Sequence, residues 1–330
     1  MTFRKLARPR RLGLLTGVDR DTYRPGRKRY PYAAGDRIAG DLTVIGHLAA
    51  GRNGHLYQVW SSRDWCAFTC KILGPEKRED RKARAALRRE AGILRRVNHP
   101  NLVHSYGEGD HDGLPYILME YVEGPSVFDL LESRPGRRLG LADSIRTAIH
   151  VGSGLHHLHA HGWLHLDLKP ANLLLRGNVP ILLDFDAARP IHPGRRSSKP
   201  LGTAPYMAPE QVRCEAAGPE ADVYGLAAVL YEMLTGRWPY EDVFTGAEPR
   251  TGEEYYYPQL GSAAPPPPSR FNEEIGAGLE GIVMRGLAHD PAERFPSLHP
   301  MLLALVTELD EPVSLWPTGV LPERRAMPRG

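Results

Sequence analysis

The chain has 330 residues, 42% of them hydrophobic and 25% charged, and its formal net charge at pH 7 is +3. This composition is typical of an ordinary globular protein with one large domain or two lobes, and the small charge makes a nucleic acid partner an unlikely interpretation. No apolar stretch approaches the roughly 18 residues that a transmembrane helix needs, and three cysteines, an odd number, favour a reducing compartment, by default the cytoplasm.

The N-terminal segment carries most of the positive charge. Residues 1–30 contain ten lysines and arginines against Asp19 and Asp21, so the rest of the chain is net acidic. Residues 1–35 have no sustained apolar period and no apolar core of a signal peptide, which predicts a basic, disordered arm. Such an arm could dock an acidic partner, nucleic acid or an anionic membrane surface, but a solubilising role is the simpler interpretation. Residues 309–330 are predicted to be a Pro-rich C-terminal tail.

Short alternating runs between glycine turns predict β-strands from Asp36 to Ile72. The runs are LTVIGHL, HLYQVWS and CAFTCKIL. Residues 78–97 carry apolar side chains on one side of a helical period and are predicted to form a helix. Two further strands are expected in LVHSYGEG and PYILMEYVEG.

After these strands the pattern becomes helical, beginning with VFDLLES and residues 141–161. Two short apolar runs, NLLL and PILLD, predict buried strands, and helices are expected again from residue 207 to about Leu309. The stretch AAPPPPSR at 263–270 is expected to be an extended surface loop. Because strands come first and helices second, the sequence predicts an α+β fold in two segregated parts with a cleft between them.

Two glycines, Gly51 and Gly54, separate the first two predicted strands. A turn with little side-chain bulk lets backbone N–H groups approach phosphate oxygens. Glycine-containing hairpins are also common where no nucleotide binds. This feature alone therefore does not predict a nucleotide site.

Lys71 ends the run CAFTCK and shares a predicted strand face with Thr69. A lysine that points inward needs an acidic partner, which Glu90 on the next predicted helix could provide. These two residues alone favour the plainer alternative of a strand end and a solvated helix face. Cys66 and Cys70 lie on the opposite face and are predicted to be core residues, because no second Cys/His pair nearby has zinc spacing.

The stretch HLDLKPANLLL is more specific. It places Asp167, Lys169 and Asn172 within six residues, and Asp184 follows the next apolar run in PILLDFD. Oxygens delivered from two neighbouring turns suit Mg²⁺, which prefers hard oxygen ligands together with phosphate oxygens. Asp167 remains as a candidate base, and Lys169 as a positive charge beside a transferred phosphoryl group. This order and spacing predict phosphoryl transfer.

These residues, together with GTAPYMAPE at 202–210, resemble the protein kinase family, specifically the bacterial, eukaryotic-like (Hanks-type) Ser/Thr kinases. The resemblance covers about residues 36–308. It implies a bilobal α+β protein kinase fold with a small, mostly β N-lobe (36–120), a hinge (120–123) and a larger, mostly α C-lobe (124–308). It also implies that ATP binds with Mg²⁺ in the cleft and that proteins with Ser or Thr acceptors are the substrates.

The resemblance also implies catalytic roles for five residues. Asp167 is implied to accept or orient the hydroxyl proton, and Lys169 to neutralise charge on the γ-phosphate. Thr203 resembles the residue that helps to position the acceptor, and Lys169 fits the Ser/Thr pattern rather than the Tyr pattern. Lys71, steadied by Glu90, is implied to hold the α- and β-phosphates.

A nucleotide and metal site is implied in the same way. In the hinge motif LMEYVEG, Met119 resembles the gatekeeper, and residues 120–122 resemble the backbone that binds adenine. Asn172 and Asp184 are the implied Mg²⁺ ligands. The full implied set is Ala49, Gly51, Gly54, Leu56, Thr69, Lys71, Met119, Glu120, Val122, Asn172 and Asp184.

Further matches concern structure rather than chemistry. Asp222 resembles the aspartate that anchors the catalytic loop, and Arg294 resembles the arginine that pairs with Glu210 of the APE motif. The run HHLHAHGWLH could suggest a metal site. The resemblance accounts for His159 and His165 structurally, so no metal is predicted there.

The chain departs from the family pattern at several positions. Leu166 replaces an arginine that normally receives an activation-loop phosphate, so a phosphate on the serines at 197–198 has no partner there. Asp186 replaces the glycine of Asp-Phe-Gly, and we expect it to restrict the loop without loss of Mg²⁺ binding. Ala49 and Thr69 also depart from the pattern and touch the implied nucleotide pocket.

Every charged or polar group that phosphoryl transfer requires is present, which predicts an active Ser/Thr kinase that does not depend on activation-loop phosphorylation. One alternative is a pseudokinase, a nucleotide-binding scaffold in which Ala49, Leu166 and Asp186 mark lost catalysis. Another is a small-molecule phosphotransferase. Glu210 and Arg294 argue against the second, because those enzymes typically lack the APE segment and its arginine.

Overall fold

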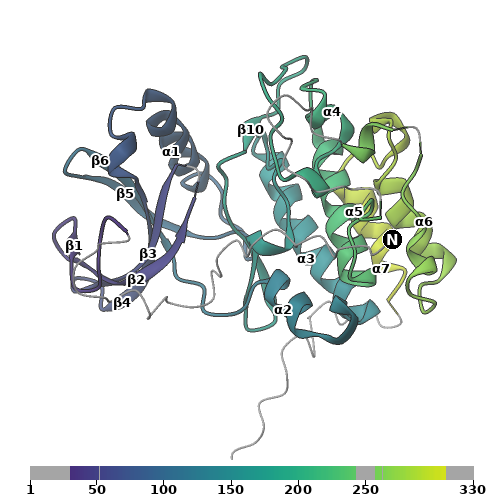
Figure 1. Cartoon of the computed structure of the whole chain (residues 1–330), viewed down its shortest axis with the longest axis horizontal. Coiled ribbons are helices and arrows are strands. Elements are labelled where there is room, and N and C mark those ends of the chain that lie inside the picture. Colours follow the sequence, from purple (N-terminus) through teal and green to yellow (C-terminus); the bar gives the residue numbers. More distant parts are fainter. Residues whose placement is uncertain (1–29, 52, 243–256, 262, 310–330) are drawn as a thin grey trace, which may run out of the picture. The chain divides into compact units, whose positions relative to one another are not determined.

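The computed structural model separates the chain into two compact units (Figure 1). The described residues are 30–51, 53–242, 257–261 and 263–309. The first unit contains residues 30–91 and 105–121, and the second contains the other described residues. Residues 1–29 of the predicted arm (1–35) and the tail after Leu309 lie outside the described residues, so docking of the arm stays a prediction. Residues 30–35 are described and pack on the sheet, where the Tyr30 ring stacks on His47 with centroids 3.5 Å apart.

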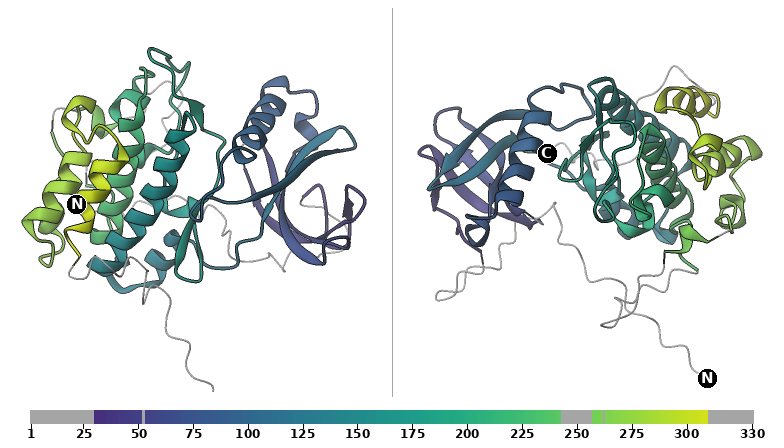
Figure 2. Two further views of the ribbon diagram at one scale, coloured as in Figure 1. Left: turned by 180° about the vertical axis from the view of Figure 1, so that it is seen from behind. Right: turned by 90° about the horizontal axis from the view of Figure 1, so that it is seen from above.

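An antiparallel sheet forms the core of the first unit, with the strand order β1-β2-β3-β4-β6-β5 (Figures 1 and 2). Its strands are β1 (Arg37–Ile38), β2 (Leu42–Ala50), β3 (Gly54–Ser61), β4 (Cys66–Leu73), β5 (Ser105–His111) and β6 (Leu114–Glu120). Alternation along β4 buries Phe68 and Cys70, as the period of two predicts. The prediction that Cys66 belongs to the core is wrong. It is exposed, because it is the first residue after the turn that joins β3 and β4.

One α-helix, α1 (Arg81–Leu94), follows β4. Asp80 starts it, because its Oδ1 accepts hydrogen bonds from the backbone N–H groups of Lys82 (2.9 Å) and Ala83 (3.1 Å). Ala83, Leu87 and Ala91 recur every four residues and are buried. Glu90 lies next to this apolar stripe and is directed inward with it.

The second unit is mostly helical. Its α-helices are α2 (Val127–Ser133), α3 (Leu141–Ala160), α4 (Pro209–Val212), α5 (Pro219–Thr235), α6 (Ala277–Gly286) and α7 (Leu298–Val306). Two short antiparallel pairs accompany them, β7 (Trp163–Leu164) with β10 (Arg189–Pro190) and β8 (Leu173–Arg176) with β9 (Val179–Leu182). Its short 3₁₀ helices are Pro135–Arg137, Pro170–Asn172, Ala204–Tyr206, Pro258–Leu260, Pro268–Arg270 and Pro291–Glu293, and the first unit contains the 3₁₀ helix Pro75–Lys77. The predicted α+β order of strands and then helices is confirmed.

Helix α5 is the centre of this unit. It packs against α3, α6 and α7, and every residue from Ala221 to Thr235 is buried. Pro219 suits the first helical position, and Gly236 ends the helix in the left-handed region at φ 73°. No helix in the described ranges is both long and apolar enough to cross a membrane.

The proline-rich stretch packs against the same helix. Pro265 and Pro268 are buried, whereas Ala264 and Pro267 are exposed. The hydroxyl of Tyr231 on α5 donates to the Pro266 carbonyl at 3.0 Å. Burial at every third residue is the period of a polyproline II segment. One side of the predicted surface loop is therefore packed.

Candidate active site

The loop between β7 and β8 carries most of the motif residues, and Asp222 of α5 anchors it. One Asp222 oxygen accepts the backbone N–H of His165 at 2.8 Å, and the other accepts that of Leu166 at 2.8 Å. The ring Nε2 of His159 donates to the same carboxylate at 2.7 Å. Asp222 is only 1% exposed. This anchor ties the start of the loop to the most buried helix of the unit.

The environment of Asp222 favours its ionised form. Burial acts to raise the pKa of this carboxyl, but the hydrogen bond and charge of His159, with smaller contributions from His165, outweigh burial and lower the pKa. The acceptor is therefore charged at neutral pH, and hydrogen bonds to a charged acceptor are stronger than neutral ones.

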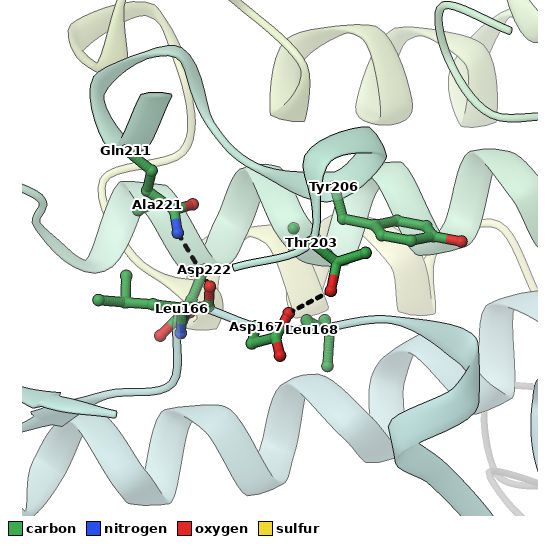
Figure 3. Close-up of a pocket in the computed structure, with 9 residues that line it drawn as sticks. Leu166, Asp167, Leu168, Thr203, Tyr206, Gln211, Ala221 and Asp222 are labelled. Atoms are coloured by element: carbon green, nitrogen blue, oxygen red, sulfur yellow. Dashed lines mark hydrogen bonds between the residues drawn. The ribbon is translucent and has the colours of Figure 1, made fainter. Parts of the chain in front are cut away.

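The anchored loop takes an unusual backbone path at Leu166. This residue has φ 65°, in the left-handed region that a leucine rarely adopts, and its side chain is buried. The hydrogen bond from its N–H to Asp222 stabilises that conformation. The result is that Asp167, the next residue, projects away from the buried Leu166 side chain (Figure 3).

Asp167, Lys169 and Thr203 form a closed hydrogen-bonded triangle. Thr203 Oγ1 donates to Asp167 Oδ1 at 2.7 Å (Figure 3). Lys169 Nζ donates to Asp167 Oδ2 at 3.3 Å and to Thr203 Oγ1 at 3.1 Å. Both Asp167 carboxylate oxygens are thus oriented by hydrogen-bond donors. The Lys169 ammonium group lies within hydrogen-bonding distance of both Asp167 and Thr203. The structure brings all three predicted catalytic residues of this unit together.

Asn172 connects this triangle to Asp184. The side-chain Nδ2 of Asn172 donates to the backbone carbonyl of Asp167 at 3.0 Å, and the backbone carbonyl of Asn172 accepts the N–H of Leu183 at 2.9 Å. Asp184 follows directly and has φ 61°. The amide nitrogen of Asn172 is used on the Asp167 carbonyl, so the amide oxygen is turned away from it. An amide oxygen and a carboxylate are a hard, oxygen-only donor set, which fits Mg²⁺.

The Asp-Phe-Asp segment at 184–186 is held in place by contacts of Phe185 and Leu183 with His165. Phe185 is fully buried, and its ring lies edge-on to His165 with centroids 5.3 Å apart. The His165 ring also contacts the Leu183 carbonyl at 3.3 Å. Asp186 lies outside the left-handed region, and Asp184 is the residue of this segment with positive φ. The segment therefore does not need glycine at position 186.

The other predicted residues belong to the first unit, where Lys71 and Glu90 form a buried ion pair. Lys71 Nζ lies 2.8 Å from Glu90 Oε1 and 2.7 Å from Oε2. The residues are 4% and 1% exposed, respectively. A buried lysine and a buried glutamate each carry a large desolvation cost unless paired, and this geometry supplies the pair. The plainer alternative of two solvated residues is wrong.

Strand register brings the other predicted nucleotide residues of this unit close to Lys71. Ala49 is the cross-strand partner of Leu56, and Leu56 is the partner of Lys71. Thr69, two residues before Lys71, is paired with Met119. Cross-strand partners and residues two apart share one sheet face. These side chains therefore line the same face as the ion pair, and Met119 is buried there.

The glycine turn between β2 and β3 has a structural cause of its own. The N–H of Gly51 donates to the Gly54 carbonyl at 2.8 Å. A Cβ added at Gly54 would lie 2.1 Å from the Ile72 carbonyl oxygen, so β3 and β4 could not approach as they do. A Cβ at Gly51 would make only an ordinary 3.7 Å contact. Of the remaining predicted residues, Glu120 ends β6, and Val122 is buried and belongs to the second unit.

Glu210 and Arg294 pair as the sequence predicts, although they are 84 positions apart. The guanidinium binds both carboxylate oxygens at 2.7 and 2.8 Å and also donates to the carbonyls of Ala288, Glu220 and His289. Such bidentate pairs are among the strongest hydrogen-bonded ion pairs. The histidine run, by contrast, brings no three metal-ligand atoms together within the described part of the chain.

Two buried glutamines, Gln211 and Gln259, were not anticipated from the sequence. Both donate to backbone carbonyls of the segment around Thr203. A signal existed for Gln211, a polar residue at a buried helical position directly after Glu210. No local pattern marks Gln259, because its contacts are about 50 residues away in the chain.

Comparison with known proteins agrees with this geometry. The model of the protein kinase domain family matches residues 42–296. Serine/threonine-protein kinase PknB of Mycobacterium tuberculosis is 33% identical over 250 residues, which are 72% of this chain and 38% of PknB. The probable serine/threonine-protein kinase SCO3848 of Streptomyces coelicolor is 31% identical over 283 residues, 83% of this chain and 41% of the relative.

A more distant relative and a solved structure show the same similarity. Serine/threonine-protein kinase PrkC of Bacillus subtilis is 29% identical over 286 residues, 84% of this chain and 42% of PrkC. The crystal structure of the Mycobacterium tuberculosis PknI kinase domain superposes with a TM-score of 0.65 and 25% identity, covering 84% of this chain and 100% of that domain. The chain spans about two fifths of the length of these curated relatives.

Proposed function

Because the chain belongs to the protein kinase family, with its bilobal α+β fold, we propose that it transfers the γ-phosphoryl group of ATP to Ser or Thr hydroxyls of proteins. The observation that carries the proposal is the triangle of Asp167, Lys169 and Thr203. It combines an oriented carboxylate, a fixed positive charge and a hydroxyl within hydrogen-bonding distance. Phosphoryl transfer is catalysed mostly by positioning and by stabilising charge, which are the two properties of this arrangement.

Each residue of the triangle has a distinct role in the proposal. Asp167 accepts or orients the proton of the attacking hydroxyl, since Thr203 and Lys169 fix the direction of its oxygens. Lys169 neutralises charge that develops on the transferred group. The Thr203 hydroxyl donates to the same carboxylate that would receive the acceptor hydroxyl, which supports specificity for Ser or Thr.

Nucleotide and metal are held by the remaining residues. Lys71, kept in place by Glu90, binds the α- and β-phosphates, and the sheet face of Ala49, Leu56 and Thr69 contacts the nucleotide. Asn172 and Asp184 would hold Mg²⁺ through oxygen. The metal, when bound, neutralises phosphate charge during transfer.

The proposal extends to regulation. Leu166 stands where other family members place an arginine, and its buried apolar side chain cannot pair with a phosphate. Ser197 and Ser198 precede Thr203 in a surface-accessible stretch. Activity should therefore not require their phosphorylation. The Ser197→Ala/Ser198→Ala double variant is expected to keep the wild-type kcat, and a loss of more than tenfold would contradict this part of the proposal.

The first experiment measures transfer from γ-labelled ATP with Mg²⁺ to the protein itself and to a generic basic protein. Wild type should label Ser or Thr, and Asp167→Asn and Asp184→Asn should not. Glu132→Gln, a surface substitution in the same unit, is the matched control. If wild type gives no label although ATP raises its melting temperature, a nucleotide-binding scaffold replaces the proposal.

A further inference from the structure

The segment from Leu201 to Met207, which contains Thr203, is attached to its surroundings through backbone carbonyls. Two glutamine side chains make these attachments, Gln211 of α4 and Gln259 of the 3₁₀ helix Pro258–Leu260. We propose that these glutamines are positioning residues that keep the acceptor-binding segment ordered without a phosphate. The inference rests on the proposed function and names the structural basis of its regulation.

Gln211 links the catalytic loop to this segment. Its Nε2 donates to the Leu166 carbonyl at 2.9 Å (Figure 3). It also donates to the Leu201 carbonyl at 2.7 Å. Its Oε1 accepts the N–H of Ala208 at 3.0 Å, which fixes the orientation of the amide. Both N–H groups are therefore used, one on the residue before Asp167 and the other two residues before Thr203. The Gln211 side chain therefore fixes the position of Asp167 relative to Thr203.

Gln259 holds the other end of the segment. Its Nε2 donates to the Ala204 carbonyl at 2.9 Å and to the Met207 carbonyl at 3.2 Å. These carbonyls flank Tyr206, whose hydroxyl donates to Glu232 of α5 at 2.6 Å. Gln259 is nearly fully buried, so water does not compete for these bonds.

Close packing leaves the segment little freedom between these contacts. Gly202 has φ 122°, and a Cβ there would lie 2.6 Å from the Leu166 carbonyl oxygen. The backbone of the segment therefore passes directly over the carbonyl that Gln211 also binds. Buried amide–carbonyl hydrogen bonds are costly to break, because the orphaned carbonyls lose all partners.

The contrast with phosphate-dependent ordering follows from these contacts. A phosphate orders a loop by charge-assisted bonds to an arginine, whose position here holds the buried Leu166. The two glutamines instead use neutral amides that are always present. The segment should accordingly be ordered in the protein as synthesised, before any modification.

The test compares Gln211→Met and Gln259→Met with Asn272→Leu. Asn272 is a matched control, because its buried Nδ2 also donates to a carbonyl, that of Leu234, at 3.0 Å, but outside the segment. Hydrogen exchange of the amides at 201–207 should become about tenfold faster in both glutamine variants and stay unchanged in the control. KM for an acceptor peptide should rise about fivefold, the equivalent of one net buried hydrogen bond, with KM for ATP unchanged.

Equal exchange in the glutamine variants and the control would overturn the inference. So would a rise in exchange at 201–207 when wild type is fully dephosphorylated. If Gln211→Met does not fold, Gln259→Met carries the same test at the other end of the segment. Hydrogen exchange needs no catalysis, so a failure of the proposed function would appear separately, as absence of transfer in wild type.

Discussion

Glu232 makes a specific prediction about stability and pH. This residue of α5 is completely buried, and burial raises the pKa of its carboxyl to about 7, although the hydrogen bond from Tyr206 and the nearby Arg137 act to lower it. The Arg137 Nη2 lies 3.7 Å away, too far for a strong pair. We predict that Glu232→Gln removes a pH-dependent destabilisation of the protein.

The magnitude follows from the two pKa values. A rise from 4.5 to about 7 corresponds to about 3 kcal/mol, at about 1.4 kcal/mol for each pKa difference of one. Since the folded state holds this proton more tightly than the unfolded state, the stabilisation is complete below about pH 4.5. It is lost as the pH rises through about 7.

Urea unfolding at a series of pH values between 5 and 8 measures this effect. The free energy of unfolding of the glutamine variant should exceed that of wild type by less than about 1 kcal/mol near pH 5 and by about 3 kcal/mol near pH 8. Glu132→Gln is the control, because Glu132 also binds Arg137, at 2.6 Å, but is 41% exposed. A difference between Glu232→Gln and wild type that does not change with pH would refute the reasoning.

Three further substitutions test other parts of the structure. Arg294→Met should lower the free energy of unfolding by about 3–5 kcal/mol, because it leaves Glu210 buried and unpaired; an unchanged melting temperature would contradict this. Gly54→Ala should destabilise the first unit and weaken ATP binding, since its Cβ would meet the Ile72 carbonyl; unchanged ATP affinity by calorimetry would argue against the close approach of the strands. Asp186→Gly should lower the free energy of unfolding by about 1 kcal/mol, the usual effect of glycine on the freedom of the unfolded chain, and a gain in melting temperature would contradict this.

Local sequence signals predicted most of the fold. The bounds of β4 and α2 are those of the runs CAFTCKIL and VFDLLES. Helix α2 begins at a well-defined residue because Ser126 and Asp129 form reciprocal capping hydrogen bonds at its N-terminus. Cys66 was misplaced because alternation gives the face of a strand but not the distance from its turn. Burial at a strand end depends on what covers it, which is tertiary information.

The site was predictable to the extent that its motifs are local. Lys71 with Glu90, and Asp167 with Lys169, lie within short or familiar spacings. The left-handed backbone falls at Asp184 and not at position 186, where the family pattern has glycine, and its place depends on how neighbouring residues hold the loop. The contacts of Gln259 join segments whose separation no period or motif records.

The packed proline stretch limits which partner proteins can bind residues 265–270. A chain with the pattern Pro-x-x-Pro-x-Arg at 265–270 would be flagged as a ligand for SH3-like domains, which grip prolines spaced by three in a groove. Here both spaced prolines, Pro265 and Pro268, face inward. Binding of such a domain would require the stretch to separate from α5 and would break the hydrogen bond from Tyr231 to the Pro266 carbonyl. An SH3-like domain could therefore bind this motif only after the proline stretch has separated from the helical unit.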